Sequence, residues 1–414
     1  MKRLIIVVAT LSLLIPFMES CKPTVVDLAK YADKIEAQLK NQTFGYAFVV
    51  SRPGEASVAR AGGEARRSQD PPPKKMSVDV KYTMASVSKN ITAAAFLKLL
   101  DDTNIKDLSL GDKLDEKIVG YLPYNWKPGA GVDTITFREL LRHRAGIRCK
   151  DNVDYQSLRQ CLAQKIDVAD KQKDCSGNSI GNNQIGCYNN VNYALFRIII
   201  SVMLGKIKPL TSQGSPSGKG SPLDKAFKDA VEEVFDVVVE QQNAALAADV
   251  YIKYVNDNVF AKAGLPQIFC RPTDDAQQGL SYKHVTPEPN GTDFGNDTLG
   301  CGSEGWFLSA SQMATYFQAL NTGKLGSPAI PVRMRDELLG YDGSAQFDSP
   351  DGKITRWWKP GGHPAAQNPG EINTYLLHFS NGVELSLIMN SDMLNGFDYG
   401  AAVTNAMSDV LNGK

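Results

Sequence analysis

The sequence predicts an α/β protein of the α+β kind, with an antiparallel sheet flanked by terminal helices and an inserted, mostly helical lobe. Strand patterns lie near both ends of the chain, at residues 44–51, 56–61, 374–379 and 383–389. Helical periodicity marks the two ends, at 24–40 and 397–411, and dominates the middle from 86 to 265. Strands from both ends pair most simply into one sheet, so the intervening helices are expected to form a separate lobe.

The first twenty residues predict a signal peptide, 1–20. Lys2 and Arg3 precede the apolar run 4–17, which is short of the roughly 20 residues that span a bilayer. Cys21 follows a small residue, where a bacterial lipoprotein would be cleaved and acylated, and ordinary cleavage without lipid is the alternative. We therefore expect an exported protein, periplasmic or held at the membrane of a bacterial envelope only by a lipid on Cys21.

The rest of the chain, 21–414, is expected to form one domain with two lobes. The sheet lobe takes about 24–85 and 345–414, and the helical lobe takes about 86–344. Turns at Arg52–Glu55 and Ser380–Gly382 separate the paired strand segments.

Charge and cysteine content narrow the possible partners. The chain has 45 basic and 45 acidic residues, so it carries no net charge that would favour nucleic acid. The sequence contains neither the C-x-x-C nor the H-E-x-x-H pattern of a metal site, and we expect no metal and no cofactor.

Six cysteines besides Cys21 are disulfide candidates: Cys149, Cys161, Cys175, Cys187, Cys270 and Cys301. Pairing of neighbours is the simplest connectivity, and free buried thiols are the alternative.

Ser86-Val87-Ser88-Lys89 is an S-x-x-K tetrad at the start of a predicted helix. Ser86 and Lys89 would lie one turn apart on the same helix face. The lysine could then accept the serine proton, provided that burial and neighbouring charges lower its pKa. The unpaired N–H at the helix start could stabilise an oxyanion. Small and apolar residues follow at 91–97, so this segment is expected to be buried.

The segment Met84–Ala93 resembles the nucleophile segment of the serine β-lactamase-related and penicillin-binding protein superfamily. That superfamily includes class C β-lactamases, D,D-peptidases and esterases. Four further segments resemble its motifs in the same order: Leu140–Ile147, Tyr188–Tyr193, Gly302–Ala310 and Gly362–Ala365. The resemblance spans roughly residues 30–412 and implies a β-lactamase/D,D-peptidase-like fold.

The resemblance also implies roles for individual residues. Tyr188, as a tyrosinate or by sharing a proton with Lys89, would be the general base for Ser86 and then protonate the leaving group. Asn190 would bind Lys89 and the substrate. Tyr254-Val255-Asn256 repeats the Y-x-N pattern, but it lies in an amphipathic helical stretch where core packing is expected.

The third motif of the family, K-T-G or H-x-G, is expected at Gly362–Ala365. His363 would line the cleft and contact the substrate, and an N–H near Ala366 would complete the oxyanion hole. Pro364 lacks an N–H, and Ala365 replaces the usual glycine. The sequence therefore leaves open whether this motif can support catalysis.

An insertion of about 207–248 also departs from the family. It is a neutral surface addition, a cover for the cleft or a site that binds a partner. The implied activity is that of an exported serine hydrolase, which forms an acyl-enzyme with an ester or a D-amino-acid peptide or amide. The expected partner is thus a small-molecule or peptide substrate. A strict D,D-peptidase or β-lactamase is one alternative, and a non-catalytic envelope binding protein with the same fold is another.

Overall fold

We describe a computed structural model of the chain over residues 26–103, 109–181, 184–210, 222–273, 278–283, 290–323, 325, 339–363 and 370–414. The expected signal peptide, the lipidation candidate Cys21 and the oxyanion candidate Ala366 lie outside these residues, as does most of the linker in the expected insertion. Within the described ranges, no helix combines the length and the apolar composition that crossing a membrane requires.

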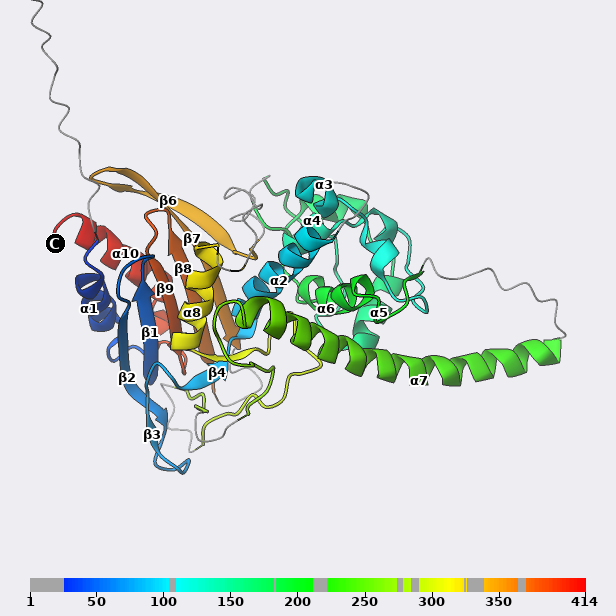
Figure 1. Ribbon diagram of the computed structural model, residues 1–414, viewed down its shortest axis with the longest axis horizontal. Helices are drawn as coiled ribbons and strands as arrows, with labels where there is room; N and C mark the ends of the chain where they lie inside the picture. Colours follow the sequence, from blue (N-terminus) through cyan, green and yellow to red (C-terminus); the bar gives the residue numbers. More distant parts are fainter. Residues whose placement is uncertain are drawn as a thin grey trace, which may run out of the picture.

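An antiparallel sheet forms one side of the molecule (Figure 1). Among the described residues it has seven strands in the order β3-β2-β1-β9-β8-β7-β6. Their bounds are Gly45–Ser51 (β1), Val58–Arg66 (β2), Lys74–Lys75 (β3), Gly343–Ser349 (β6), Gly352–His363 (β7), Ile372–Phe379 (β8) and Glu384–Met389 (β9). Tyr46 of β1 pairs with Met389 of β9, so the two ends of the chain share one sheet, as predicted.

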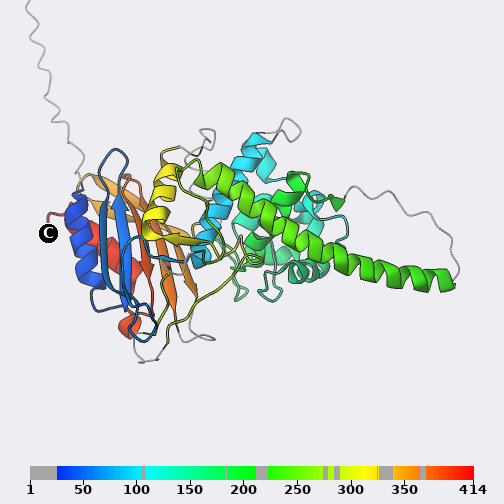
Figure 2. The ribbon, with the colours of Figure 1, turned by 60° about the horizontal axis from the view of Figure 1, so that its bottom comes forward.

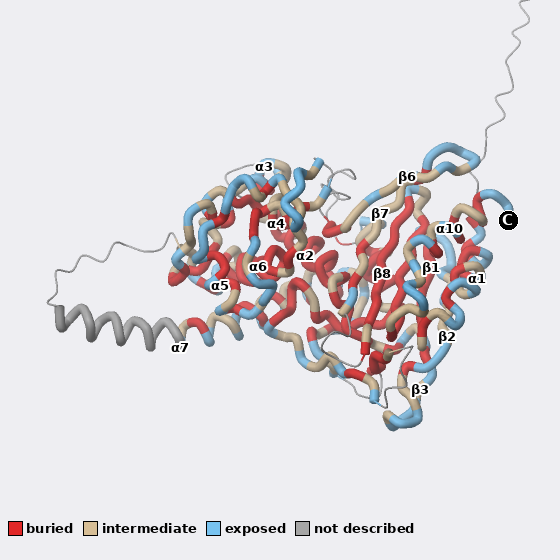
Figure 3. The backbone as a smooth tube through the Cα atoms, turned by 180° about the vertical axis from the view of Figure 1, so that it is seen from behind, coloured by how far each residue is buried: buried red, intermediate tan, exposed pale blue. Residues whose placement is uncertain are grey.

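Helices cover both faces of this sheet (Figures 1 and 2). Helices α1 (Leu28–Leu39) and α10 (Tyr399–Leu411) pack together on one face, where Tyr31 donates a hydrogen bond to Val403 O at 3.0 Å. Helix α8 (Ala310–Asn321) packs on the other face against β1 and β9, although the helical lobe was expected to include its residues. Because both faces are covered, β1, β8 and β9 are buried along their whole length (Figure 3).

The helical lobe surrounds α2, whose side chains are nearly all buried. Helix α2 contains the small, buried residues Ala93, Ala94 and Ala95, and it packs against α6 and α7. The helices of the lobe are α2 (Ser88–Asp102), α3 (Leu110–Leu114), α4 (Phe137–Leu141), α5 (Tyr155–Ala163), α6 (Val191–Met203) and α7 (Pro222–Val255). A π-helical turn, η6 (Asn256–Phe260), continues α7.

Three disulfides join neighbouring cysteines, Cys149–Cys161, Cys175–Cys187 and Cys270–Cys301. The predicted connectivity is therefore present. Disulfides persist in oxidising compartments, so this set fits an exported protein.

A second, two-stranded sheet connects the two parts of the molecule. Strand β4 (Lys81–Thr83) pairs with β5 (Phe307–Ser309), and Met84 N–H continues the pairing to Trp306 O at 2.7 Å. Neither this sheet nor the β6–β7 hairpin was expected from the sequence. Because β4 leads directly into Ser86, the small sheet fixes the entry to the S-x-x-K segment.

Candidate active site

Ser86 lies on a tight turn between β4 and α2. It is the central residue of the 3-10 turn η1 (Ala85–Val87), and the preceding Ala85 has φ 44°, which is strained for a residue with a β-carbon. Strand β7 approaches the same turn through Gly361, where an added β-carbon would lie 2.7 Å from Met84 O and 2.8 Å from Val87 N. A glycine here therefore lets the sheet touch the backbone of the turn, and Ser86 lies where the sheet meets the helical lobe.

Lys89 is buried and directed at Ser86. Its Nζ donates to Ser86 Oγ at 2.9 Å, to Asn190 Oδ1 at 2.5 Å and to Ser303 O at 2.8 Å. Burial lowers the pKa of Lys89 to about 7, and the nearby charge of Lys359 contributes in the same direction. A substantial fraction of Lys89 is thus neutral near neutral pH and can accept a proton.

Tyr188 completes the predicted group of three. Its hydroxyl donates to Ser86 Oγ at 2.6 Å, and its ring stacks on His143 with centroids 4.4 Å apart. Burial raises the pKa of Tyr188 far above its usual value, and the charge of Asp342 adds to the effect. The phenol therefore keeps its proton at neutral pH, which favours a proton donor over the tyrosinate considered from the sequence.

The second Y-x-N segment has a structural use. Asn256 donates to Ile268 O at 2.8 Å and accepts from Ile268 N at 2.7 Å, so it ties η6 to the following loop. Tyr254 precedes it on α7 and is partly buried against the core of the helical lobe. Of the two candidate tyrosines, Tyr188 is the one that meets Ser86.

Lys359 lies beside Tyr188, a position that was not predicted from the sequence. It is fully buried on β7, forms an ion pair with Asp342, and places its Nζ 5.1 Å from the centroid of the Tyr188 ring. Its segment, Lys359-Pro360-Gly361, matches K-T-G with proline in place of threonine, and this pattern could have revealed it. The residue of β7 that faces Tyr188 is therefore Lys359.

His363, the expected third-motif residue, lies at the end of β7. It stacks on Phe294 with centroids 5.0 Å apart, and its Nε2 is 3.6 Å from Glu304 Oε2. Burial lowers its pKa, although Glu304 acts in the opposite direction. Among the contacts of the described residues, none joins His363 directly to Ser86, Lys89 or Tyr188.

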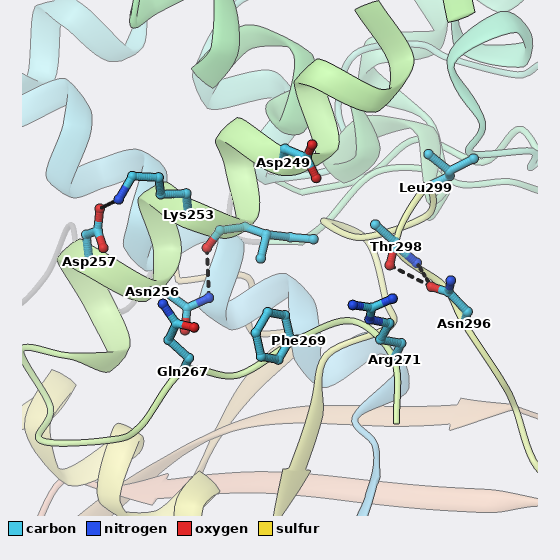
Figure 4. A pocket seen from close by; sticks show the side chains of 11 residues that line it. Asp249, Lys253, Asn256, Asp257, Gln267, Phe269, Arg271, Asn296, Thr298 and Leu299 are labelled. Carbon is cyan, nitrogen blue, oxygen red and sulfur yellow. Dashed lines mark hydrogen bonds and ion pairs between the residues drawn. The ribbon is translucent and has the colours of Figure 1, made fainter. Parts of the chain in front are cut away.

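A separate pocket of about 500 Å³ opens between the end of α7 and the loop 296–299 (Figure 4). Asp249 and Arg271 project into it from opposite sides, and Lys253 is paired with Asp257 at its edge. Neither Ser86, Lys89 nor Tyr188 lines this pocket, so it is distinct from the Ser86 group.

The covered antiparallel sheet, the helical lobe and the serine–lysine–tyrosine group together define a β-lactamase-type fold. A family model described as Beta-lactamase matches residues 31–206. Over these residues, which are fewer than half of the chain, the sequence is similar to the Beta-lactamase family. A comparison with curated protein sequences found no match.

Solved structures share this fold over nearly the whole chain. A class C β-lactamase from Rhodobacter sphaeroides has a TM-score of 0.54 at 15% identity, covering 91% of this chain and 98% of its own. The D-amino acid amidase from Ochrobactrum anthropi SV3 complexed with L-phenylalanine amide has a TM-score of 0.57 at 15% identity, covering 93% and 97%. A β-lactamase/D-alanine carboxypeptidase from Yersinia pestis has a TM-score of 0.57 at 14% identity, also covering 93% and 97%. At these identities the likeness establishes the fold.

Proposed function

We propose that the protein is an exported serine hydrolase that cleaves an ester or a D-amino-acid peptide or amide through an acyl-enzyme on Ser86. This proposal rests on two hydrogen bonds to Ser86 Oγ, one from Lys89 Nζ and one from the Tyr188 hydroxyl. A nucleophile with a base and a proton donor at hydrogen-bond distance is the arrangement that acyl transfer requires.

The pKa shifts divide the proton transfers between two residues. Neutral Lys89 takes the proton of Ser86 as Oγ attacks the carbonyl carbon. Tyr188, which is protonated, donates to the leaving group and regains a proton from the Lys89 ammonium. Water then attacks the carbonyl of the acyl-enzyme while neutral Lys89 takes a proton from it, and Ser86 Oγ leaves by receiving this proton from the Lys89 ammonium. Such positioned acid–base catalysis contributes on the order of 10²–10⁴ in rate.

The oxyanion would be held by the Ser86 N–H and, as we expect from the resemblance, by an N–H near Ala366. Asn190 would support the site through its contact with Lys89. His363, Phe294 and Glu304 form one cluster beyond the end of β7 and are proposed to contact the substrate. No cofactor takes part in the proposed reaction.

The disulfides support export, and the similar solved structures include a D-amino acid amidase and a β-lactamase/D-alanine carboxypeptidase, which supports a small-molecule or peptide substrate. Anchoring by a lipid on Cys21 remains part of the proposal. Intact-mass analysis of protein from the native host, with Cys21→Ala as the control, would detect a diacylglycerol-sized addition. Mature protein of unmodified mass would refute the anchor and leave the hydrolase proposal untouched.

Lys359 favours a second candidate, a strict D,D-peptidase or β-lactamase. Among the members of the superfamily that the sequence resembles, true β-lactamases carry lysine in the third motif. In this protein the lysine of Lys359-Pro360-Gly361 faces Tyr188. A buried ammonium at this place could attract the carboxylate that penicillins and peptide C-termini share, because burial strengthens such a pairing.

The decisive experiment is active-site labelling followed by mass analysis. A fluorophosphonate should label the wild-type protein and should not label the folded Ser86→Ala variant. Intact mass after incubation with esters, D-amino-acid amides and penicillins would then identify the acyl donor, with persistent penicilloyl adducts or penicillin turnover favouring the second candidate. A correctly folded wild-type protein that resists every reagent would instead be the non-catalytic binding protein.

A further inference from the structure

Asn190 connects the Lys89 amine to a carboxylate on the opposite side. Its Oδ1 accepts from Lys89 Nζ at 2.5 Å, while its Nδ2 donates to Asp151 Oδ2 at 3.1 Å. The backbone N–H of Asn190 also donates to Asp151 Oδ1, at 2.6 Å. A carboxylate only accepts hydrogen bonds, so Asp151 forces the amide to present its nitrogen on one side and its oxygen to Lys89.

The loop that carries Asp151 is fastened on both sides. The Cys149–Cys161 disulfide ties it to α5, and Asn189 Nδ2 donates to Cys149 O at 3.0 Å. Two residues beyond Asp151, Val153 O accepts from Arg197 Nη2 at 2.8 Å, and Arg197 is buried in α6. These contacts hold the carboxylate at a fixed place against the start of α6.

We propose that Asp151 is a positioning residue of the Ser86 site, which fixes the Asn190 amide so that its oxygen holds Lys89 against Ser86. This inference rests on the proposed function for its catalytic consequence, but the hydrogen-bond relay itself does not. Without Asp151, the amide could turn, and a turned amide would place a donor group against the Lys89 donor.

The negative charge of Asp151 also affects the pKa of Lys89. Asp151, Glu304 and Asp342 raise the pKa of Lys89, while burial and Lys359 lower it. The titratable and charged groups facing this lysine from the surrounding elements are Asp151, Glu304, Asp342, Lys359, Tyr188, His143 and His363. Removing one of the three negative charges therefore favours the neutral amine, and acylation should begin at lower pH.

The test compares Asp151→Asn with a matched change in the same loop. Asp151→Asn keeps the size of the side chain and removes its charge and one acceptor. Asp154→Asn is the control, because Asp154 caps α5 by accepting from Ser157 N, a role that asparagine also fulfils. The readouts are the maximal rate of fluorophosphonate labelling, the pH at which that rate is half-maximal, and a crystal structure of each variant.

For Asp151→Asn we expect a maximal rate lower by about tenfold or more, since misorientation of a catalytic group by about 1 Å has such effects. The half-maximal pH should fall by about half a unit. In the crystal structure, Asn190 Oδ1 should no longer accept from Lys89. Asp154→Asn should change none of the three.

An Asn190–Lys89 contact that survives in Asp151→Asn would overturn the inference, and so would equal losses of rate in the two variants. Wild-type protein that is never labelled would instead refute the proposed function. In that case the crystal structures would still decide whether Asp151 orients Asn190, so the two failures are distinguishable.

Discussion

Replacing Lys359 by methionine should raise the pH that acylation of Ser86 requires. Lys89 Nζ lies 4.9 Å and Lys359 Nζ lies 5.1 Å from the centroid of the Tyr188 ring, so the two ammonium groups are at most about 10 Å apart. Two unit charges at that distance repel by about 1.7 kcal/mol at an effective dielectric constant of about 20. This repulsion corresponds to roughly one pK unit.

The sign follows from which form of Lys89 reacts. In the proposed mechanism the neutral amine is the base. Lys359 disfavours the charged form, so Lys359→Met should raise the pKa of Lys89 from about 7 to roughly 8. Asp342 loses its ion-pair partner in the variant and acts in the same direction. Below the midpoint, labelling should therefore be about tenfold slower than in the wild type.

The assay is the rate of fluorophosphonate labelling measured from about pH 5 to pH 9. Lys353→Met is the matched control, because Lys353 is also on β7, is largely exposed and pairs with Asp348. The control should keep the wild-type midpoint. A midpoint that stays in place or moves to lower pH in Lys359→Met would refute the electrostatic account of Lys89.

Three further predictions concern single residues of the site. Tyr188→Phe should slow acylation by about 10²–10⁴, whereas Tyr254→Phe should leave it near the wild-type rate, and equal labelling rates would argue against Tyr188 as the acid. Burial of Lys89 lowers its pKa from 10.5 to about 7, so this lysine destabilises the fold fully below pH 7 and less as the pH rises towards 10.5. Lys89→Met should therefore raise the free energy of unfolding by up to about 5 kcal/mol near pH 6, and a gain in denaturant titrations that is independent of pH would contradict this. Gly361→Ala should lower the free energy of unfolding by about 1–3 kcal/mol, because its methyl group would press on the backbone at Met84, and an unchanged melting temperature would show that the strand can move.

Local pattern was sufficient for the sheet at the chain ends and for the start of α2. The strands containing Tyr46 and Leu387 are mostly apolar, and the Ser86–Lys89 spacing needs only one turn of helix. The resemblance implied a strand carrying His363, but local pattern did not indicate the rest of β7, because Pro360 and its neighbouring glycines resemble a loop in sequence. The observed strand includes this proline, and Gly361 allows contact with the Ser86 turn.

Lys359 and Asp151 could not be found by periodicity, because their importance comes from distant contacts. A lysine in a strand is ordinarily exposed, whereas Lys359 is buried and paired with Asp342. Asp151 lies in a polar loop without periodicity, and the Cys149–Cys161 disulfide and the start of α6 bring it to Asn190.

The proposed division of roles between Lys89 and Tyr188 follows from how the charges around them are paired. Asp342 pairs with Lys359, and burial is the largest cause of the lowered Lys89 pKa, ahead of the Lys359 charge. The same carboxylate raises the pKa of the buried Tyr188 phenol. One ion pair therefore favours a phenol that keeps its proton without preventing Lys89 from losing one. Two groups that contact one serine oxygen thus differ in proton affinity, which is the condition for one to act as base and the other as acid.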